Sequence, residues 1–265
     1  GEGEWYDRYF DTDLSNSMVV GPYCFSSCDN CEVPNMSLSF DGDDDIVDMG
    51  GPVINQPSVF TVLGWFKVNS TTSTNYFFNH GNGGEIKVFI QNDNLVVWIK
   101  TTSGYLDQLT APITVGQWHH YAVTFENNNA VKLYLDGSEI TSQSIGDITL
   151  NSSSGNLTFG MSNNGDGNPF MGLIDETSIW ETILTDDQIN EMMYTQLSGY
   201  ENGLVGSWNF NDGEGETLTD LSPNGNHGTI NGATWSDDFP LPPHTGPEWY
   251  VSEDGSDENN GSANY

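Results

Sequence analysis

The sequence predicts an all-β protein in which two antiparallel sheets form a sandwich, accompanied by one short helix. Two observations support this fold class. From Met36 onward, apolar segments recur about every ten residues and are bounded by Gly, Asn, Asp and Pro, which is typical of antiparallel strands and not of βαβ units. Only one segment, after Thr185, shows apolar residues at helical spacing. A chain of 265 residues is long enough to bury the core of one such sandwich.

Several strands can be placed from their flanking turns. The Asp136-Gly137 pair favours a type I′ hairpin within residues 133–140, and Asn92, Asp93 and Asn94 form a turn between two further strands. The segment around Trp118, Tyr121, Val123 and Phe125 predicts another inner strand, so His119 and His120 are expected at core or strand-edge positions. The remaining expected strands are residues 60–68, 86–91 and 95–101.

Residues 168–197 combine a strand with the helix. Phe170, Gly172 and Ile174 alternate with Met171, Leu173 and Asp175, the pattern of a half-buried strand. Thr185 and Gln188 have the spacing of a capping box, and Ile189, Met192 and Met193 follow at helical intervals before Gly199. This order predicts a long strand that carries an Asp-Glu pair and leads directly into a short amphipathic helix.

Four ordered motifs carry a family resemblance: LSFDGDDDIVDM (38–49), VFTVLGWFKV (59–68), GQWHHYAVTFENNNAVKLYLDGSEI (116–140) and GLIDETSIWETILTDDQI (172–189). Together they resemble LamG-like, concanavalin A-like jelly-roll domains, the group of laminin G modules and pentraxins. The resemblance spans about residues 36–239. It implies a jelly-roll sandwich, but this fold serves lectins, adhesins, spacers and hydrolases alike, so function must be argued from the site.

Charge excludes two classes of partner. Five basic residues stand against 38 acidic ones, and the formal net charge is −33. Nucleic acid and anionic membrane surfaces would be repelled. An acidic, lysine-poor surface suits an extracellular or cell-surface protein in salty, calcium-bearing water, where cations screen carboxylate repulsion. No run of 18 apolar residues is present, and no signal peptide precedes the opening GEGEW, so a processed or recombinant N-terminus is expected.

The N-terminal arm, residues 1–35, lies outside the resemblance. It holds four aromatic residues within six positions, which we expect to cover either an edge of their own sandwich or a neighbouring molecule. Cys24, Cys28 and Cys31 are too few for a structural zinc site, and the nearest histidine is His80. One local disulfide with one remaining thiol is expected, and the sequence leaves the pairing open.

The C-terminal third raises a question of topology. Residues 203–235 resemble a stretch that many LamG-like proteins place before the FDG motif, whereas here it follows the helix. Either residues 199–239 complete their own sandwich in permuted order, or a second domain begins. We favour the first, because Leu204, Val205, Trp208 and Phe210 would otherwise expose a strand of apolar surface. Residues 240–265 are a proline-rich linker and an acidic tail that resembles the opening of a parallel β-helix, so the natural protein is expected to continue.

Calcium is the expected cofactor. The resemblance implies an ion site formed by Asp41, the carbonyl of Gly42 and Asp175, which joins the first and last strands of the motif set. Asp43, Asp44 and Asp45 compete for the remaining positions, and four aspartates within five residues would repel one another without a cation. The structural alternative is a polar turn after a strand.

Asparagine-rich loops are the candidate ligand-binding elements. The cluster NNGDGN, with Asn163, Asp166 and Asn168, lacks EF-hand spacing and could bind calcium or sugar hydroxyls, or form a plain turn. Asn82, in the loop HGNGGE, is a similar candidate. In DLSPNGNHG, Asp220 and Asn226 are expected to bond their own backbone instead.

Catalysis is not predicted. Laminarinase-type hydrolases need three carboxylates at alternating positions along one strand, and no segment offers them. A nucleophile elbow, an HExxH motif and a phosphate loop are absent as well.

The sequence therefore predicts an extracellular, calcium-stabilised binding or adhesion module, with a glycan or a cell-surface or matrix protein as its partner. One alternative is the structural subunit of a surface polymer or filament that self-associates through terminal strands or arms. The other is a spacer domain before a β-helix domain.

Overall fold

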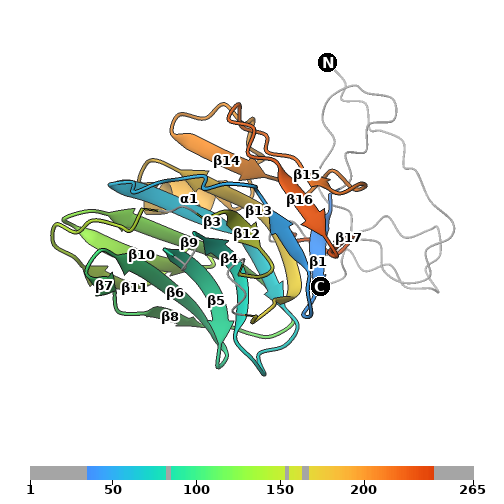
Figure 1. Cartoon of the computed structure of the whole chain (residues 1–265), viewed down its shortest axis with the longest axis horizontal. Coiled ribbons are helices and arrows are strands. Elements are labelled where there is room, and N and C mark those ends of the chain that lie inside the picture. Colours follow the sequence, from blue (N-terminus) through green and yellow to red (C-terminus); the bar gives the residue numbers. More distant parts are fainter. Residues whose placement is uncertain (1–34, 82–84, 153–154, 163–166, 242–265) are drawn as a thin grey trace, which may run out of the picture. The chain divides into compact units, whose positions relative to one another are not determined.

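Two antiparallel sheets lie face to face in the computed structural model, which describes residues 35–81, 85–152, 155–162 and 167–241 (Figure 1). The predicted all-β sandwich is confirmed. Sheet A has the order β11-β10-β9-β3-β13-β1-β17, with β14 also paired to β13. Sheet B has the order β15-β16-β2-β12-β4-β5-β6-β7, with β8 also paired to β6. The described residues belong to one compact unit, residues 33–265.

The strands of sheet A are β1 (Ser37–Asp41), β3 (Val59–Val68), β9 (Trp118–Glu126), β10 (Ala130–Leu135), β11 (Ser138–Ser144), β13 (Met171–Trp180), β14 (Leu204–Trp208) and β17 (Thr234–Ser236). Those of sheet B are β2 (Ile46–Asp48), β4 (Asn75–His80), β5 (Ile86–Gln91), β6 (Asn94–Thr101), β7 (Gly104–Tyr105), β8 (Leu109–Pro112), β12 (Leu157–Phe159), β15 (Thr217–Leu218) and β16 (Gly228–Asn231). The single described helix is α1 (Asp186–Met192).

The core lies between the two sheets and is rich in aromatic rings. Phe66 of β3 stacks on Phe77 of β4 with ring centroids 4.9 Å apart, so the stack connects one sheet to the other. Phe159 of β12 contacts Trp208 of β14 edge to face at 5.5 Å. Each buried ring of this kind contributes about 1.5–3 kcal/mol through loss of apolar surface to water. The core can therefore hold the sheets together without a metal or disulfide.

The predicted hairpin turns are confirmed. Asp136 and Gly137 both have positive φ, 49° and 77°, as a type I′ turn between β10 and β11 requires. Asn92 and Asp93 also have positive φ, 50° and 58°, between β5 and β6. Asn and Asp tolerate this left-handed conformation better than other non-glycine residues, which explains why they occupy these positions.

Helix α1 begins as its sequence predicts. The Thr185 hydroxyl accepts the N–H of Gln188, and the Gln188 side chain accepts the N–H of Thr185, which completes the capping box. Ile189 is fully buried against Leu63, Ala122 and Tyr134, so the helix covers the outer face of sheet A. The prediction that β13 is half buried is wrong, because only Met171 of β13 is exposed. Helix α1 packs on Trp180, the last residue of this strand.

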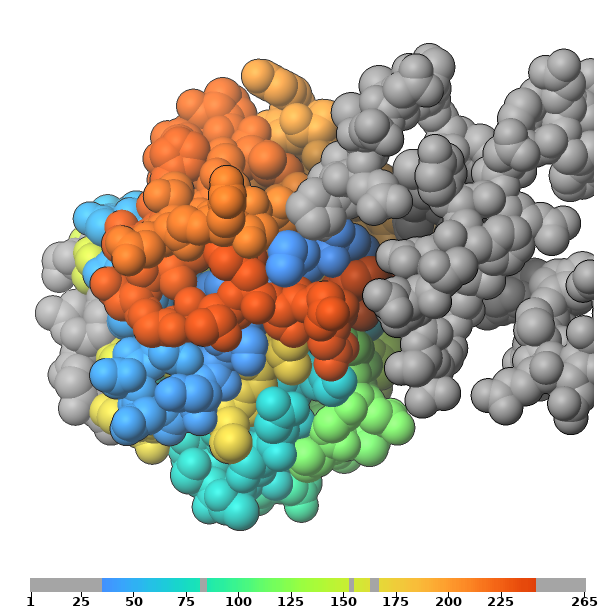
Figure 2. Space-filling model, turned by 90° about the vertical axis from the view of Figure 1, so that its right-hand side faces the viewer, coloured from blue at the N-terminus to red at the C-terminus, as the bar shows by residue number. Residues whose placement is uncertain are grey.

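The last strands pair with the first. β14 pairs with the second half of β13, β16 pairs with β2, and β17 pairs with β1. Figure 2 shows the result, in which the blue N-terminal strand residues lie among orange and red C-terminal ones. Trp208 and Phe210 are fully buried in the common core. Residues 204–236 therefore contribute strands to both sheets of this sandwich.

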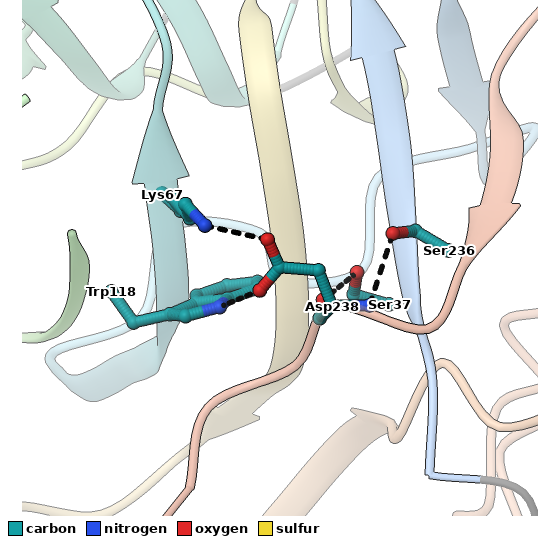
Figure 3. Close-up of polar contacts among 5 residues, drawn as sticks. All are labelled: Ser37, Lys67, Trp118, Ser236 and Asp238. Carbon is teal, nitrogen blue, oxygen red and sulfur yellow. Dashed lines mark hydrogen bonds and ion pairs between the residues drawn. The ribbon is translucent and has the colours of Figure 1, made fainter. Parts of the chain in front are cut away.

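Asp238 fastens the end of this segment across sheet A (Figure 3). Its carboxylate lies 2.5 Å from Nζ of Lys67 and accepts the indole N–H of Trp118 at 2.8 Å. Its main-chain carbonyl accepts the hydroxyl of Ser37, and its N–H donates to the hydroxyl of Ser236. Asp238 thus contacts β1 and β17 on one side of β13, and β3 and the first residue of β9 on the other side. One residue therefore links the two sides of sheet A across β13.

The predicted N-terminal arm, including Cys24, Cys28 and Cys31, lies outside the described residues, as does the acidic tail beyond Leu241. In the part that is described, α1 is too short to cross a membrane and no other helix is present.

Candidate ligand-binding site

Three aspartates come together in the loop between β1 and β2. Carboxylate oxygens of Asp41, Asp44 and Asp45 all lie within 4.8 Å of one another. Asp45 is 6% exposed, and its carboxylate accepts the N–H of Asp41 at 2.7 Å. Burial raises the pKa of Asp45, and the carboxylates of Asp41 and Asp44 raise it further, against the opposing hydrogen bond from Asp41. These groups form the oxygen-rich, negatively charged arrangement that calcium prefers.

The predicted pairing of Asp41 with Asp175 in one ion site is wrong. In the register of β1 with β13, Asp41 faces Met171, which is four residues from Asp175. Four residues of a strand span roughly 13 Å, whereas calcium holds its ligands at about 2.3–2.6 Å. The motif resemblance places both aspartates on neighbouring strands, but it does not fix the register between them.

Gly42 and Asp43 remain beside the acidic group. Gly42 has φ of +86°, and a Cβ there would lie 2.9 Å from Cβ of Met171, so only glycine fits this turn without strain. The N–H of Asp43 donates to the carboxylate of Asp41 at 2.8 Å, which is the local bonding of a polar turn. Neither residue is among the three whose carboxylate oxygens cluster, and their predicted role as ligands stays a prediction.

The buried Asp175 instead lies beside the half-buried Glu176 at an irregularity of β13. Asp175 faces Trp65 and Ser178 faces Leu63, so two residues, Glu176 and Thr177, oppose Gly64 alone in a β-bulge. Asp175 is 1% exposed; one carboxylate oxygen accepts the N–H of Glu176, and the other has no hydrogen-bond partner. Burial and the neighbouring Glu176 raise the pKa of Asp175, and burial raises that of Glu176 to about 7.

The histidines have structural environments. His119 is 7% exposed; one ring nitrogen lies 2.8 Å from the carboxylate of Asp136 and the other accepts the N–H of Thr114. His120 is fully buried against Trp65, and burial lowers its pKa to about 3. The prediction that both occupy core or strand-edge positions is confirmed. His119 fixes the β10–β11 turn to β9 through Asp136.

Of the predicted ligand residues, only Asn168 can be placed. Asn82, Asn163 and Asp166 lie outside the described residues. Asn168 has φ of +59°, and its carbonyl accepts the N–H of Tyr76 at 2.9 Å, so this end of the asparagine-rich loop meets the edge of β4. In the other predicted turn, Asp220 accepts the N–H groups of Ser222 and Asn226, which confirms its structural role.

An aromatic cluster that the sequence reading missed lies on the outer face of sheet B. Along β6, Leu95, Val97 and Ile99 enter the core, so Val96, Trp98 and Lys100 point outward. Trp98 stacks on Tyr105 with ring centroids 4.6 Å apart and an interplanar angle of 23°. Behind this pair lies a second cluster, in which Phe89 contacts both Trp98 and Tyr76. The sequence contained one signal for this cluster: Trp98 occupies a position of β6 at which the alternation places outward-facing residues, which are usually polar.

Tyr105 is the ring of this cluster that solvent, and therefore a ligand, can reach most easily. It is 47% exposed, whereas Tyr76 and Phe89 are 8% and 2% exposed. Lys100, which pairs with Tyr105 across β6 and β7, places its ammonium 5.6 Å from the centre of the Tyr105 ring. We call Trp98, Lys100 and Tyr105 the β6–β7 platform. It offers an aromatic face, a cation and a supporting layer of buried rings.

A groove beside α1 is a weaker candidate. It has a volume of about 480 Å³ and is lined by residues of β9, β10 and the start of α1. Two of its polar groups bond each other, since Tyr134 donates to Asp186 at 2.8 Å, and a third, Lys132, donates to Glu139 of β11 at 2.7 Å. A ligand in this groove would have to replace bonds that the protein already makes.

A scan against protein families finds a match over residues 41–190. The family, Laminin_G_3, is described as the concanavalin A-like lectin/glucanases superfamily and covers residues 41–190, more than half of the chain. The chain belongs to this superfamily. The predicted family is therefore confirmed, whereas the resemblance of the tail to a β-helix stays a prediction. A search of curated proteins finds no sequence that matches the chain.

Solved structures share the superfamily's fold. One is a protein of Bacteroides ovatus described as a candidate carbohydrate binding protein: it is 20% identical, with a TM-score of 0.65 over 78% of this chain and 61% of its own length. Another is the Ruminococcus gnavus IT-sialidase CBM40 bound to α2,3-sialyllactose, 15% identical, with a TM-score of 0.50 over 58% of this chain and 95% of its own. A heptameric SAP-like pentraxin of Limulus polyphemus is 15% identical, with a TM-score of 0.48 over 61% and 82%. The chain thus spans about three fifths of the length of the Bacteroides protein.

Proposed function

We propose that this binding module is a non-catalytic, extracellular carbohydrate-binding and adhesion module, and that the β6–β7 platform is its ligand site. The observation that carries the proposal is Tyr105, which is 47% exposed while its ring stacks on Trp98. The exposed Tyr105 ring and the partly buried Trp98 ring form one continuous apolar surface, and a ligand that covers it would remove this surface from water. Tyr105 is therefore the residue to test.

Sugar chemistry suits this surface. The C–H face of a pyranose ring packs on an aromatic ring, and its hydroxyls remain available to amides and water. The Trp98–Tyr105 pair is supported from below by Phe89, whose ring centre lies 6.1 Å from that of Trp98, so the platform is formed before a ligand arrives. The Bacteroides and Ruminococcus proteins, which share the fold, are described as binding carbohydrate, and this agrees with the proposal.

Calcium belongs to the proposal as a structural ion. Asp41, Asp44 and Asp45 fit it, because they supply oxygen ligands within 4.8 Å of one another and would otherwise repel. Asp45 also lies against Gly232, where a Cβ would come within 2.1 Å of its carboxylate oxygen. An ion bound here would stabilise the β1–β2 loop beside the chain that joins β16 to β17. It would be remote in sequence from the β6–β7 platform.

The polymer and spacer alternatives depend on residues 1–35 and 240–265, nearly all of which lie outside the described residues. They remain predictions from the sequence. No contact within the described residues favours either of them over glycan binding.

The test is a glycan array followed by calorimetry on the full chain. We expect retention of at least one glycan, and Tyr105→Ala should weaken its binding at least tenfold, about 1.4 kcal/mol, because the stacking face is removed. Tyr200→Ala is the matched control, since Tyr200 is an 80% exposed tyrosine outside the β6–β7 platform. Absence of any bound glycan, or equal loss in both variants, would contradict the proposal.

A further inference from the structure

The four lysines of this chain differ in what their ammonium groups contact. Lys67 lies 2.5 Å from the carboxylate of Asp238, and Lys132 lies 2.7 Å from that of Glu139. Lys87 is 4% exposed and lies over the ring of Tyr76. Lys100 is partly exposed and lies over the ring of Tyr105, and no carboxylate in the described part of the chain is within ion-pair distance of it.

Lys100 is a partly exposed cation that contacts no carboxylate of the described residues. This is notable because the chain has 38 acidic residues and five basic ones. At the β6–β7 platform, the chain instead places Lys100 on an aromatic ring, which attracts the ammonium weakly through its π face. The ammonium keeps its capacity to donate to an anion, and it does so beside the exposed ring of Tyr105.

We propose that the β6–β7 platform selects glycans that carry an acidic sugar. The pyranose ring packs on Tyr105, and its carboxylate or sulfate group accepts hydrogen bonds from Lys100. This inference rests on the proposed glycan-binding function and names the ligand class of the same site. A charge-assisted hydrogen bond of this kind is stronger than a bond between neutral groups.

The net charge of the protein limits how acidic the ligand can be. A formal charge of −33 repels polyanions at long range. At physiological ionic strength the Debye length is about 8 Å, so repulsion from distant carboxylates is largely screened while a direct contact with Lys100 is not. The preferred ligand is therefore a glycan with one acidic residue among neutral ones, and not a uniformly charged polymer.

The experiment uses an array of matched glycans on the full chain at physiological ionic strength. Each neutral oligosaccharide is printed beside the same backbone with one terminal uronic acid and beside the same backbone with one sulfate. The carboxyl-reduced form of the uronic acid member restores the neutral sugar. We expect the acidic members to bind at least tenfold more tightly than their neutral counterparts, and the two acidic arms show whether carboxylate or sulfate is preferred.

Three variants test whether Lys100 causes the preference for acidic glycans. Lys100→Gln should remove the difference between acidic and neutral members, and Lys100→Arg should keep it because the charge remains. Lys132→Gln, which removes a lysine of sheet A that is paired with Glu139, should leave the difference unchanged. Thermal melting of each variant checks that the fold is intact.

The outcomes separate this inference from the proposed function. Equal binding of neutral and acidic members that is lost in Tyr105→Ala would overturn acid selection and leave glycan binding in place. Selection of acidic members that survives Lys100→Gln, or that is lost equally in Lys132→Gln, would overturn the role of Lys100. Absence of binding to any member would overturn both proposals.

Discussion

Glu176 is a carboxylate whose surroundings disfavour its ionised form. It has φ of +47°, an uncommon value for a residue with a side chain, and it follows the buried Asp175 directly. Two adjacent carboxylates in such a place cannot both ionise without a free-energy cost. The bulge in β13 is the physical reason for this arrangement, because it inserts the extra residue between the pairs made by Asp175 and Ser178.

Glu176→Gln should change how stability depends on pH. Burial raises the pKa of Glu176 to about 7 in the folded protein, so the folded state binds its proton more tightly than the unfolded state. The wild type therefore loses stability as pH rises from about 4.5 to about 7, and the loss persists above pH 7. The neutral Gln variant lacks this loss and should be the more stable protein at pH 8.

Urea unfolding at pH 5 and pH 8 measures the difference. Glu181→Gln is the control, because Glu181 is an exposed glutamate that follows β13. If the Glu176 variant and the wild type lose equal stability between the two pH values, the pair of Asp175 and Glu176 does not govern this behaviour.

At the scale of the elements, short strands depend on contacts outside their ladders. β17 has three residues and pairs with β1 at the edge of sheet A. Asp238, just beyond it, reaches Lys67 and Trp118 across β13. Burial alone would raise the pKa of Asp238, but the hydrogen bonds from Lys67 and Trp118 outweigh it and lower the pKa. A side chain thus supplies stability that a three-residue ladder lacks.

Asp238→Ala should destabilise the protein by about 1 kcal/mol, which corresponds to a fall of about 2–4 °C in Tm. The value is modest because the Asp238 side chain is 43% exposed and solvent screens its ion pair. Since the folded pKa is lowered, the contribution is present above the unfolded pKa of about 3.9 and is lost as pH falls below it. The loss is complete only below the lowered folded pKa, so calorimetric scans should show a larger difference at pH 7 than at pH 3.

Asp237→Ala provides the matched comparison, because Asp237 is the exposed neighbour of Asp238. Equal effects of the two substitutions would mean that Asp238 acts through general charge and not through Lys67 and Trp118.

At the scale of the whole molecule, the acidic loop lies where the first described strands meet the last ones, β16 and β17. Asp45 precedes β2, which pairs with both β12 and β16, and it lies against Gly232 between β16 and β17. A calcium ion here would bind the native state alone, since the unfolded chain does not hold Asp45 beside Gly232. Binding would therefore stabilise the entire sandwich by mass action.

Saturating calcium should raise the free energy of unfolding by roughly 2–3 kcal/mol at 100 times its dissociation constant. Tm should rise by about 5–10 °C, and chelator should reverse the change. Asp45→Asn should abolish the calcium response, and the exposed Asp187→Asn should retain it. A melting curve that is the same with calcium and with chelator would end the proposal of a structural ion.

Local patterns were sufficient where neighbours in sequence decide the structure. Alternating apolar residues placed β3 and β5, Asp136-Gly137 placed its hairpin, and Thr185 with Gln188 placed the start of α1. Turns and caps depend on interactions within four or five residues, so the sequence contains all their determinants. The family motifs, taken in their order along the chain, added the superfamily and its jelly-roll sandwich.

The tertiary structure decided which strands pair, in which register they pair, and which face of each strand is buried. Asp41 and Asp175 lie on paired strands, but a register that places Asp41 opposite Met171 separates them. Both faces of β13 are buried, with α1 packed on Trp180 at its end, and Trp98 meets Tyr105 because β6 pairs with β7. Alternation of apolar and polar residues identifies a strand and its two faces. It does not identify the partner strand or the pairing register, since those are set by contacts between segments distant in sequence.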